Sequence, residues 1–139
     1  MTDLFIDTDV IIDFLIDRKP YSREGANIFT LIEEKKLRGY VSSLSFSNLY
    51  YVLRKVESHN KVLAKLDSIS EIVNILKVDQ QTIKNALDTG FLDFEDSIQY
   101  CCARDNKKID VLITRNTKDF KNSEIPIMTP ADLLKMVST

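Results

Sequence analysis

A chain of 139 residues with 44% hydrophobic and 29% charged residues has the size and composition of one soluble globular domain, residues 1–139. Its net charge of -2 gives no overall basic character of the kind found in many nucleic-acid-binding domains. No stretch approaches the roughly 20 apolar residues of a membrane span, and an acidic start argues against a secretory signal. The adjacent Cys101 and Cys102 are expected to be buried thiols, which favours a reducing cytoplasm.

Apolar runs alternate with helical patterns along the first half of the chain. Residues 4–6 predict a buried strand, and the spacing that begins at Thr8 or Asp9 predicts a helix to Asp17. An amphipathic pattern then predicts a helix over 21–37, with Gly39 as its stop signal. The same reasoning predicts a strand over 40–42, a helix from a cap at Ser43 or Ser45 to Val56, and a helix over 59–68.

The second half continues the alternation. A strand is expected over 72–78, then a helix capped by Asp79 that ends near Gly90. A helix over 94–105 follows Asp93, and 111–113 is the clearest buried strand. A strand around Pro126 belongs at an edge, and Thr129-Pro130 opens the last helix. Such β-α units predict an α/β fold with a parallel sheet of about five strands covered by helices on both faces.

Polar residues follow two of these strands directly. Ligands of open α/β sheets lie beyond the carboxyl ends of the strands, near the switch in strand order. Asp7, Thr8 and Asp9 follow the first strand, and residues 114–119 follow the fourth, so the two segments are expected to meet. A turn and a helix cap would explain Asp7 and Asp9 equally well when they are taken alone.

Two further clusters are expected at the same edge. Asp93 and Asp96 stand at a helix start, where an acidic capping arrangement is the alternative explanation. The segment after the fourth strand offers Thr114, Asn116 and Asp119, with a polar loop as its alternative. The candidates for binding the substrate lie in the same segment and are Arg115 and Lys118.

Clustered carboxylates favour hard divalent cations. Mg²⁺ and Mn²⁺ prefer oxygen ligands and keep several water molecules, so two to four carboxylates suffice. Such an ion can orient a phosphodiester and generate a nucleophilic hydroxide.

Three segments resemble PIN-domain proteins, in the family's order along the chain. They are residues 5–13 (FIDTDVIID), 93–103 (DFEDSIQYCCA) and 113–120 (ITRNTKDF). The resemblance implies a three-layer α/β/α fold and Mg²⁺- or Mn²⁺-dependent ribonuclease activity. By position it implies Asp7, Asp96 and Asp119 as catalytic and metal-binding residues, with Asn116 and Asp93 as further ligands and Asp9 and Thr114 as supporting polar groups.

Many small members of that family are toxins of VapBC-type toxin–antitoxin pairs that commonly dimerise. The resemblance therefore implies RNA as substrate, an antitoxin protein as partner and a homodimer. One position departs from the pattern, because Asn48 stands where the family usually has Glu. Asparagine can coordinate through its carbonyl oxygen but brings no negative charge, so weaker metal binding is expected.

Two alternatives follow from the same residues. Asp7 and Asp9 also resemble the first motif of haloacid dehalogenase-type phosphatases, with Asp7 as nucleophile and Asp9 as general acid. The order of the later motifs disagrees, since Asp93 and Asp96 precede Thr114. The other alternative is a PIN-like module that binds RNA or protein without cutting, which Asn48 and Asn116 keep open.

Overall fold

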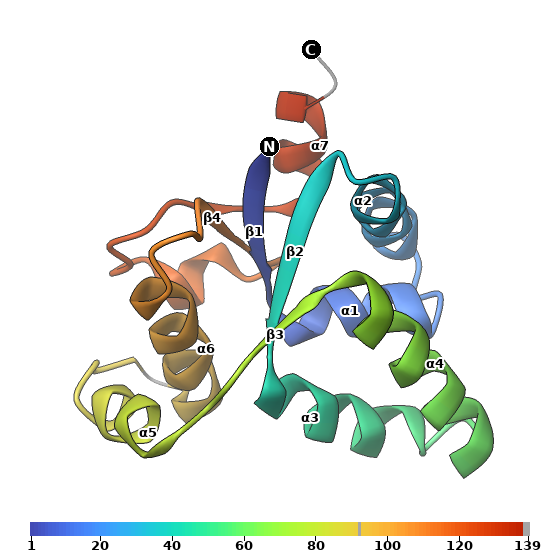
Figure 1. Ribbon diagram of the computed structural model, residues 1–139, viewed down its shortest axis with the longest axis horizontal. Coiled ribbons are helices and arrows are strands. Elements are labelled where there is room, and N and C mark those ends of the chain that lie inside the picture. Colours follow the sequence, from blue (N-terminus) through green and yellow to red (C-terminus); the bar gives the residue numbers. More distant parts are fainter. Residues whose placement is uncertain (92, 138–139) are drawn as a thin grey trace.

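The computed structural model describes residues 1–91 and 93–137, and its centre is a sheet of five parallel strands (Figure 1). The strand order is β3-β2-β1-β4-β5, with every neighbouring pair parallel. This arrangement confirms the parallel sheet of about five strands that the β-α alternation predicts. The strands are β1 (Thr2–Ile6), β2 (Leu37–Ser42), β3 (Asn74–Leu76), β4 (Val111–Ile113) and β5 (Ile127–Met128).

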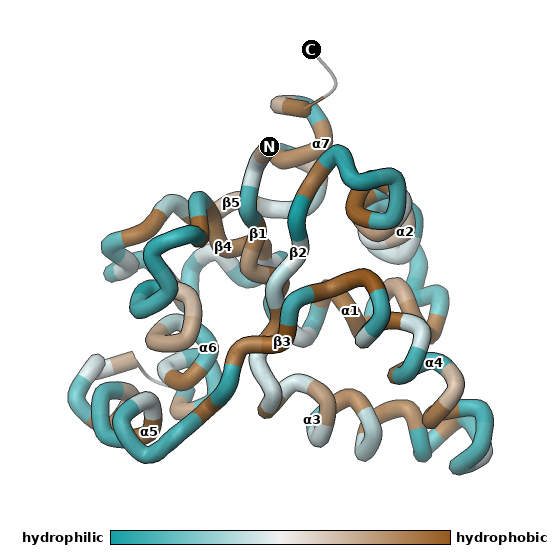
Figure 2. Tube along the Cα trace, viewed as in Figure 1, coloured by the Kyte–Doolittle hydropathy of each residue, from teal (hydrophilic) through white to brown (hydrophobic). Residues whose placement is uncertain are grey.

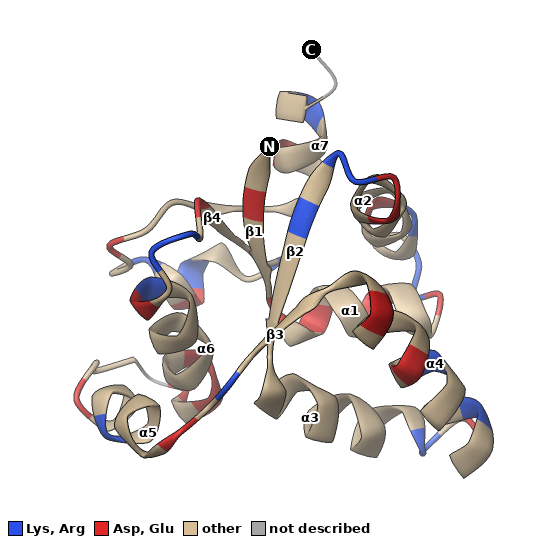
Figure 3. Cartoon of the chain, in the orientation of Figure 1, with Lys and Arg blue, Asp and Glu red and all other residues tan. Residues whose placement is uncertain are grey.

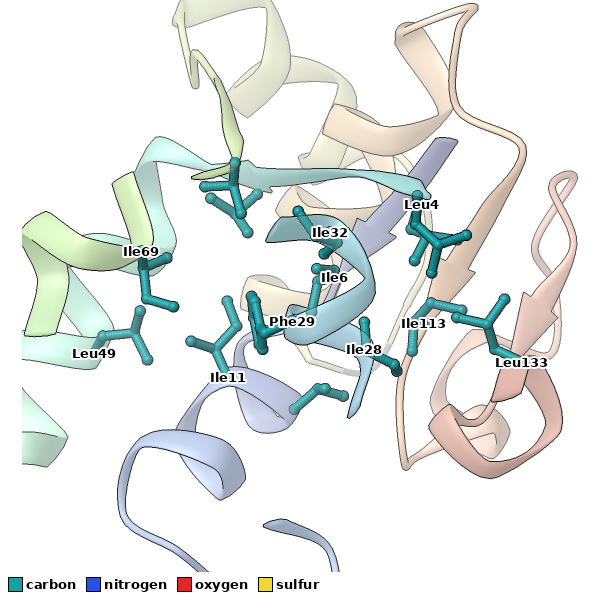
Figure 4. Packing of buried hydrophobic residues seen from close by; sticks show 14 of the residues in the cluster. Leu4, Ile6, Ile11, Ile28, Phe29, Ile32, Leu49, Ile69, Ile113 and Leu133 are labelled. Carbon is teal, nitrogen blue, oxygen red and sulfur yellow. The ribbon is translucent and has the colours of Figure 1, made fainter. Parts of the chain in front are cut away.

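Helices cover both faces of this sheet, as predicted. Successive residues of a strand point to opposite faces, so β1 sends Leu4 and Ile6 into one core and Phe5 into the other. Helices α1 to α4 and α7 pack on the first core (Figure 4), and α5, α6 and η1 pack on the second. The helices are α1 (Thr8–Leu15), α2 (Ser22–Glu33), α3 (Ser43–Leu53), α4 (His59–Ile72), α5 (Gln80–Leu87), α6 (Phe94–Asp105), the short 3₁₀ helix η1 (Thr117–Phe120) and α7 (Pro130–Val137).

Hydrophobic residues gather along β1, β4 and α1, whereas the end of α6 and the loop that follows it are hydrophilic (Figure 2). Cys101 and Cys102 are buried free thiols on α6, as expected from the sequence. Within the described part of the chain, none of the helices has the length and apolar character needed to cross a bilayer.

The strand order places the carboxyl ends of β1 and β4 side by side. From β1 the chain builds outwards through β2 and β3, then returns to add β4 and β5 on the other side of β1. The backbone N–H of Asp7 donates to the carbonyl of Ile113 at 2.9 Å, which joins the exits of the two strands. This is the switch point at which open α/β sheets bind their ligands.

The predicted boundary between the second helix and the second strand was wrong. Helix α2 ends at Glu33, Lys35 adopts a positive φ of 62°, and β2 already begins at Leu37. Gly39 therefore lies inside β2 instead of stopping a helix. A Cβ at Gly39 would lie 2.7 Å from Cδ1 of Ile32, so glycine lets α2 pack closely on the strand.

Other predicted boundaries also shift. The strand predicted over 72–78 is shorter, because α4 continues to Ile72 and β3 pairs only over Asn74–Leu76. Ser42, and not Ser43 or Ser45, caps α3 by accepting a hydrogen bond from the backbone N–H of Ser45. The cap of α6 at Asp93 and its span Phe94–Asp105 agree with the sequence-based prediction.

Candidate active site

Asp7 is buried and fixed by two hydrogen bonds at the end of β1. The backbone N–H of Thr8 donates to its Oδ1 at 2.8 Å, which caps α1. The Thr114 hydroxyl donates to its Oδ2, also at 2.8 Å, from the end of β4. Only 6% of Asp7 is exposed, so both strand exits hold this carboxylate rigidly. Burial raises the pKa of Asp7 well above its usual range, and the neighbouring Asp9 raises it further.

A buried network of hydrogen bonds holds Thr8, the residue that follows Asp7. The Thr8 and Ser45 hydroxyls lie 2.8 Å apart, and Nε2 of Gln99 donates to both of them, at 2.8 and 3.0 Å. The network joins the start of α1, the first turn of α3 and the middle of α6. Gln99 and Ser45 are fully buried, and sequence reasoning assigned neither of them to the site. One signal was available, because Gln99 is a polar residue inside the otherwise apolar stretch Ile98–Ala103.

Asp9 lies beside Asp7 in the first turn of α1. Nδ2 of Asn116 donates to its Oδ2 at 3.2 Å, which brings the segment after β4 onto α1 as predicted. Oδ1 of Asp9 is buried without a hydrogen-bond partner among the described residues. Burial raises the pKa of Asp9 to about 6, although the positive charge of Arg115 lowers it. A buried oxygen of this kind is available to a further ligand.

The start of α6 supplies the second group of carboxylates. Asp93 caps the helix by accepting a hydrogen bond from the backbone N–H of Asp96 at 3.0 Å. Burial, followed by the charges of Asp93 and Asp119, raises the pKa of Asp96 to about 7. Glu95 and Asp9 contribute in the same direction, so carboxylates of α1, α6 and η1 act on one another. Figure 3 shows the acidic segments at the start of α1 and at the lower end of α6.

Arg115 and Lys118 occupy different surroundings. Arg115 donates from Nε to Oδ2 of Asp13 at 2.5 Å and from Nη2 to Oδ1 at 3.2 Å. Its guanidinium also lies over the Tyr21 ring, 4.2 Å from the centroid. Asp13 is 1% exposed, so this ion pair anchors the segment after β4 to α1. Lys118 is exposed on η1, next to Asp119.

Asn48 has a partner that the sequence did not suggest. Its Nδ2 donates to Oε1 of Glu95 at 2.7 Å, so α3 contacts the start of α6. From the sequence, Asn48 could offer its carbonyl oxygen to an ion, and Glu95 was assigned no role. Partial burial raises the pKa of the Glu95 carboxyl, the hydrogen bond from Asn48 lowers it, and the charge of Asp93 raises it.

The donor set fits a hard divalent cation in its chemistry. Its members are carboxylate and amide oxygens, one of which is the unpartnered Oδ1 of Asp9. Across residues 1–91 and 93–137, no three acidic, histidine or cysteine side chains converge closely enough to form a ready-made ion cage. Both oxygens of Asp7 are already hydrogen-bonded, and the neighbouring carboxylates repel one another. A positive ion would therefore relieve the repulsion that raises these pKa values.

A model of the PIN domain family matches residues 3–118 of this sequence. The chain belongs to the PIN domain family. The matched range contains the first two segments that carry the resemblance in full, and the third segment as far as Lys118. Membership of the PIN family counts against the phosphatase interpretation of Asp7 and Asp9.

Individual PIN proteins are similar over nearly the whole chain. The curated ribonuclease VapC1 of Aquifex aeolicus (strain VF5) is 26% identical over 141 residues, which cover 98% of this chain and 96% of that protein. A chain in a toxin–antitoxin complex from Klebsiella pneumoniae has a TM-score of 0.66 at 24% identity, over 91% of this chain and 97% of that one. A chain of the DNA-bound VapBC2 structure from Rickettsia felis gives 0.70 at 15% identity, over 92% and 98%. These structural likenesses confirm the three-layer α/β/α fold.

Proposed function

We propose that this PIN-domain chain is a Mg²⁺- or Mn²⁺-dependent endoribonuclease and the toxin of a toxin–antitoxin pair. The observation that carries the proposal is the group of mutually interacting carboxylates at the end of β1 and the start of α6. Asp7, Asp9 and Asp96 all have raised pKa values because they are buried near one another. The full-length similarity to a ribonuclease of the VapC type supports RNA as the substrate.

The proposed roles follow from where each side chain lies. Asp7 and Asp96 would both hold the ion, one fixed by Thr114 and the other at the start of α6. Asp119 would complete the site from η1 and Asp93 from the cap of α6. A bound Mg²⁺ or Mn²⁺ would supply charge neutralisation at the phosphodiester and an activated water molecule.

The amide and hydroxyl groups would keep these acids in place. Asn116 holds Asp9 by its side-chain hydrogen bond. Thr114 links Asp7 to Asn116, because its hydroxyl donates to Asp7 and accepts from the backbone N–H of Asn116 at 3.1 Å. Asn116 would also offer its carbonyl oxygen to the ion.

Substrate contact is proposed for Lys118, which is exposed beside Asp119 and can reach a phosphate as a mobile positive charge. We propose that Arg115 contributes less to substrate binding than Lys118, since Asp13 already holds its guanidinium.

A protein antitoxin is the proposed partner, since several similar structures are toxin–antitoxin complexes. The homodimer and the cytoplasmic location stay predictions from the sequence.

The proposed function is tested by incubating the purified chain with single-stranded and structured RNA in Mg²⁺, in Mn²⁺ and in EDTA. We expect internal cleavage with either ion and none in EDTA. Single-stranded DNA of the same sequence and a small phosphomonoester serve as controls. An RNA left intact in both ions would refute the nuclease proposal and favour the non-cutting PIN-like module. Cleavage that persists in EDTA would refute the metal dependence.

A further inference from the structure

The two helices that border the site contribute unequal charge. Helix α3 has no acidic or basic residue along Ser43–Leu53 (Figure 3). Helix α6 begins with three acids in four residues, Asp93, Glu95 and Asp96. Of these two helices, only α6 can therefore contribute negative charge to the space between them. The polar groups that α3 contributes are an amide and hydroxyls, which can orient a carboxylate but cannot replace it.

Two contacts connect these helices, and they follow the helical repeat. Residues four apart on a helix lie on the same face, as do residues three apart. Gln99 and Glu95 are four apart on α6 and contact Ser45 and Asn48, which are three apart on α3. The Gln99 contact is buried and reaches Thr8, the residue after Asp7. Glu95 therefore stands on the α6 face that looks towards α3, one turn outwards from the network that supports Asp7.

The outer contact is accessible and carries a charge. Nδ2 of Asn48 donates to Oε1 of Glu95 over 2.7 Å, and hydrogen bonds to ionised acceptors are stronger than neutral ones. Glu95 remains exposed while Gln99 is fully buried. A fixed, accessible carboxylate at this position can contact a ligand.

We propose that Glu95 is a further acidic residue of the active site, which binds the divalent cation directly or through a water molecule, and that Asn48 positions it. The inference rests on the proposed metal-dependent nuclease function. It assigns to α6 the charge that α3 lacks, and it gives Asn48 a role as a hydrogen-bond donor to Glu95.

The first test measures Mn²⁺ binding to the purified chain by calorimetry, without RNA. Glu95→Gln removes the charge but keeps an oxygen that can accept from Asn48, so the fold is retained. We expect about 10-fold weaker Mn²⁺ binding, the scale seen when groups around a metal site are changed. The matched control is Glu71→Gln, because Glu71 is exposed on α4 just before β3, at the edge of the sheet opposite the site. The control should bind Mn²⁺ as the parent does.

A charge-swapped pair separates position from charge. The double variant Asn48→Glu with Glu95→Gln keeps one carboxylate and one amide but exchanges the helices that carry them. We expect it to recover Mn²⁺ binding and RNA cleavage to within about threefold of the parent, whereas Glu95→Gln alone does not. Asn48→Ala should weaken Mn²⁺ binding less than Glu95→Gln does, because the carboxylate remains but is no longer held.

The outcomes distinguish this inference from the proposed function. If the parent binds Mn²⁺ and cleaves RNA while Glu95→Gln equals it in both, Glu95 has no place in the site and the nuclease proposal stands. If Glu95→Gln binds Mn²⁺ as tightly as the parent does, and the double variant binds it with the same affinity, the inference fails. If Glu95→Gln weakens Mn²⁺ binding in a parent that cuts no RNA, the inference holds and the nuclease proposal fails.

Discussion

Replacing Asp96 with asparagine is expected to reduce RNA cleavage by more than about 100-fold, beyond the usual cost of changing a group that only supports a metal site. The same substitution is expected to stabilise the folded chain at pH 8 in EDTA. Asp96 faces several like charges, and burial together with these charges raises its pKa to about 7. A residue that destabilises the fold while serving a reaction is typical of active sites.

The pH dependence of this effect has a definite sign. The folded chain holds a proton on Asp96 up to about pH 7, whereas an aspartate in the unfolded chain has a pKa near 3.8. The folded state thus binds more protons between these values, and the free energy of unfolding falls as pH rises through the window. Asparagine does not titrate, so the variant should exceed the parent by about 1–2 kcal/mol at pH 8 after allowance for solvent screening. The difference should vanish towards pH 4.

Urea denaturation of parent and variant at pH 4, 6 and 8 in EDTA measures this difference. Glu71→Gln is the control, because Glu71 is an exposed acid on α4. Mn²⁺ should stabilise the parent more than the variant, since a ligand that binds only the folded state raises stability by mass action. A variant less stable than the parent at pH 8 would contradict the repulsion, and cleavage within threefold of the parent would remove Asp96 from the reaction.

The sequence predicted the parts of the fold that follow from local patterns. Apolar runs located β1 and β4, and Asp93 marked the start of α6, because buried strands and helix caps depend on neighbouring residues. The start of β2 was wrong for a non-local reason. Gly39 ordinarily indicates a helix stop, but here it makes room for Ile32 of α2 against the strand. Such close packing is decided by the tertiary structure.

The site shows the same division between local and distant information. The rule that strand ends meet at one edge correctly brought the residues after β1 and after β4 together, as the Thr114–Asp7 and Asn116–Asp9 hydrogen bonds show. Partners across the fold were not predictable, because no sequence pattern links Asn48 with Glu95, 47 residues away. The roles of these side chains in metal binding and cleavage stay predictions.

Arg115 differs from the acids because its main contact is structural, and its loss is expected to be costly. Replacing it with methionine should lower the free energy of unfolding by about 3 kcal/mol, since removal of its main partner leaves a buried charge with only the more exposed Arg18 to balance it. That charge is Asp13, which is 1% exposed and receives two hydrogen bonds from Arg115. The apolar stem of methionine can still cover Tyr21, so the expected loss comes mainly from the charge.

A second arginine provides the matched control. Arg18 also pairs with Asp13, at 3.3 Å, but its side chain is 44% exposed. Exposed ion pairs contribute about 0–1 kcal/mol, so Arg18→Met should cost far less than Arg115→Met in the same urea denaturation experiment. The double variant Asp13→Asn with Arg115→Met should recover most of the loss, because it removes the buried charge itself. Equal costs for the two arginines, or no recovery in the double variant, would show that Arg115 stabilises the chain by packing and not by neutralising Asp13.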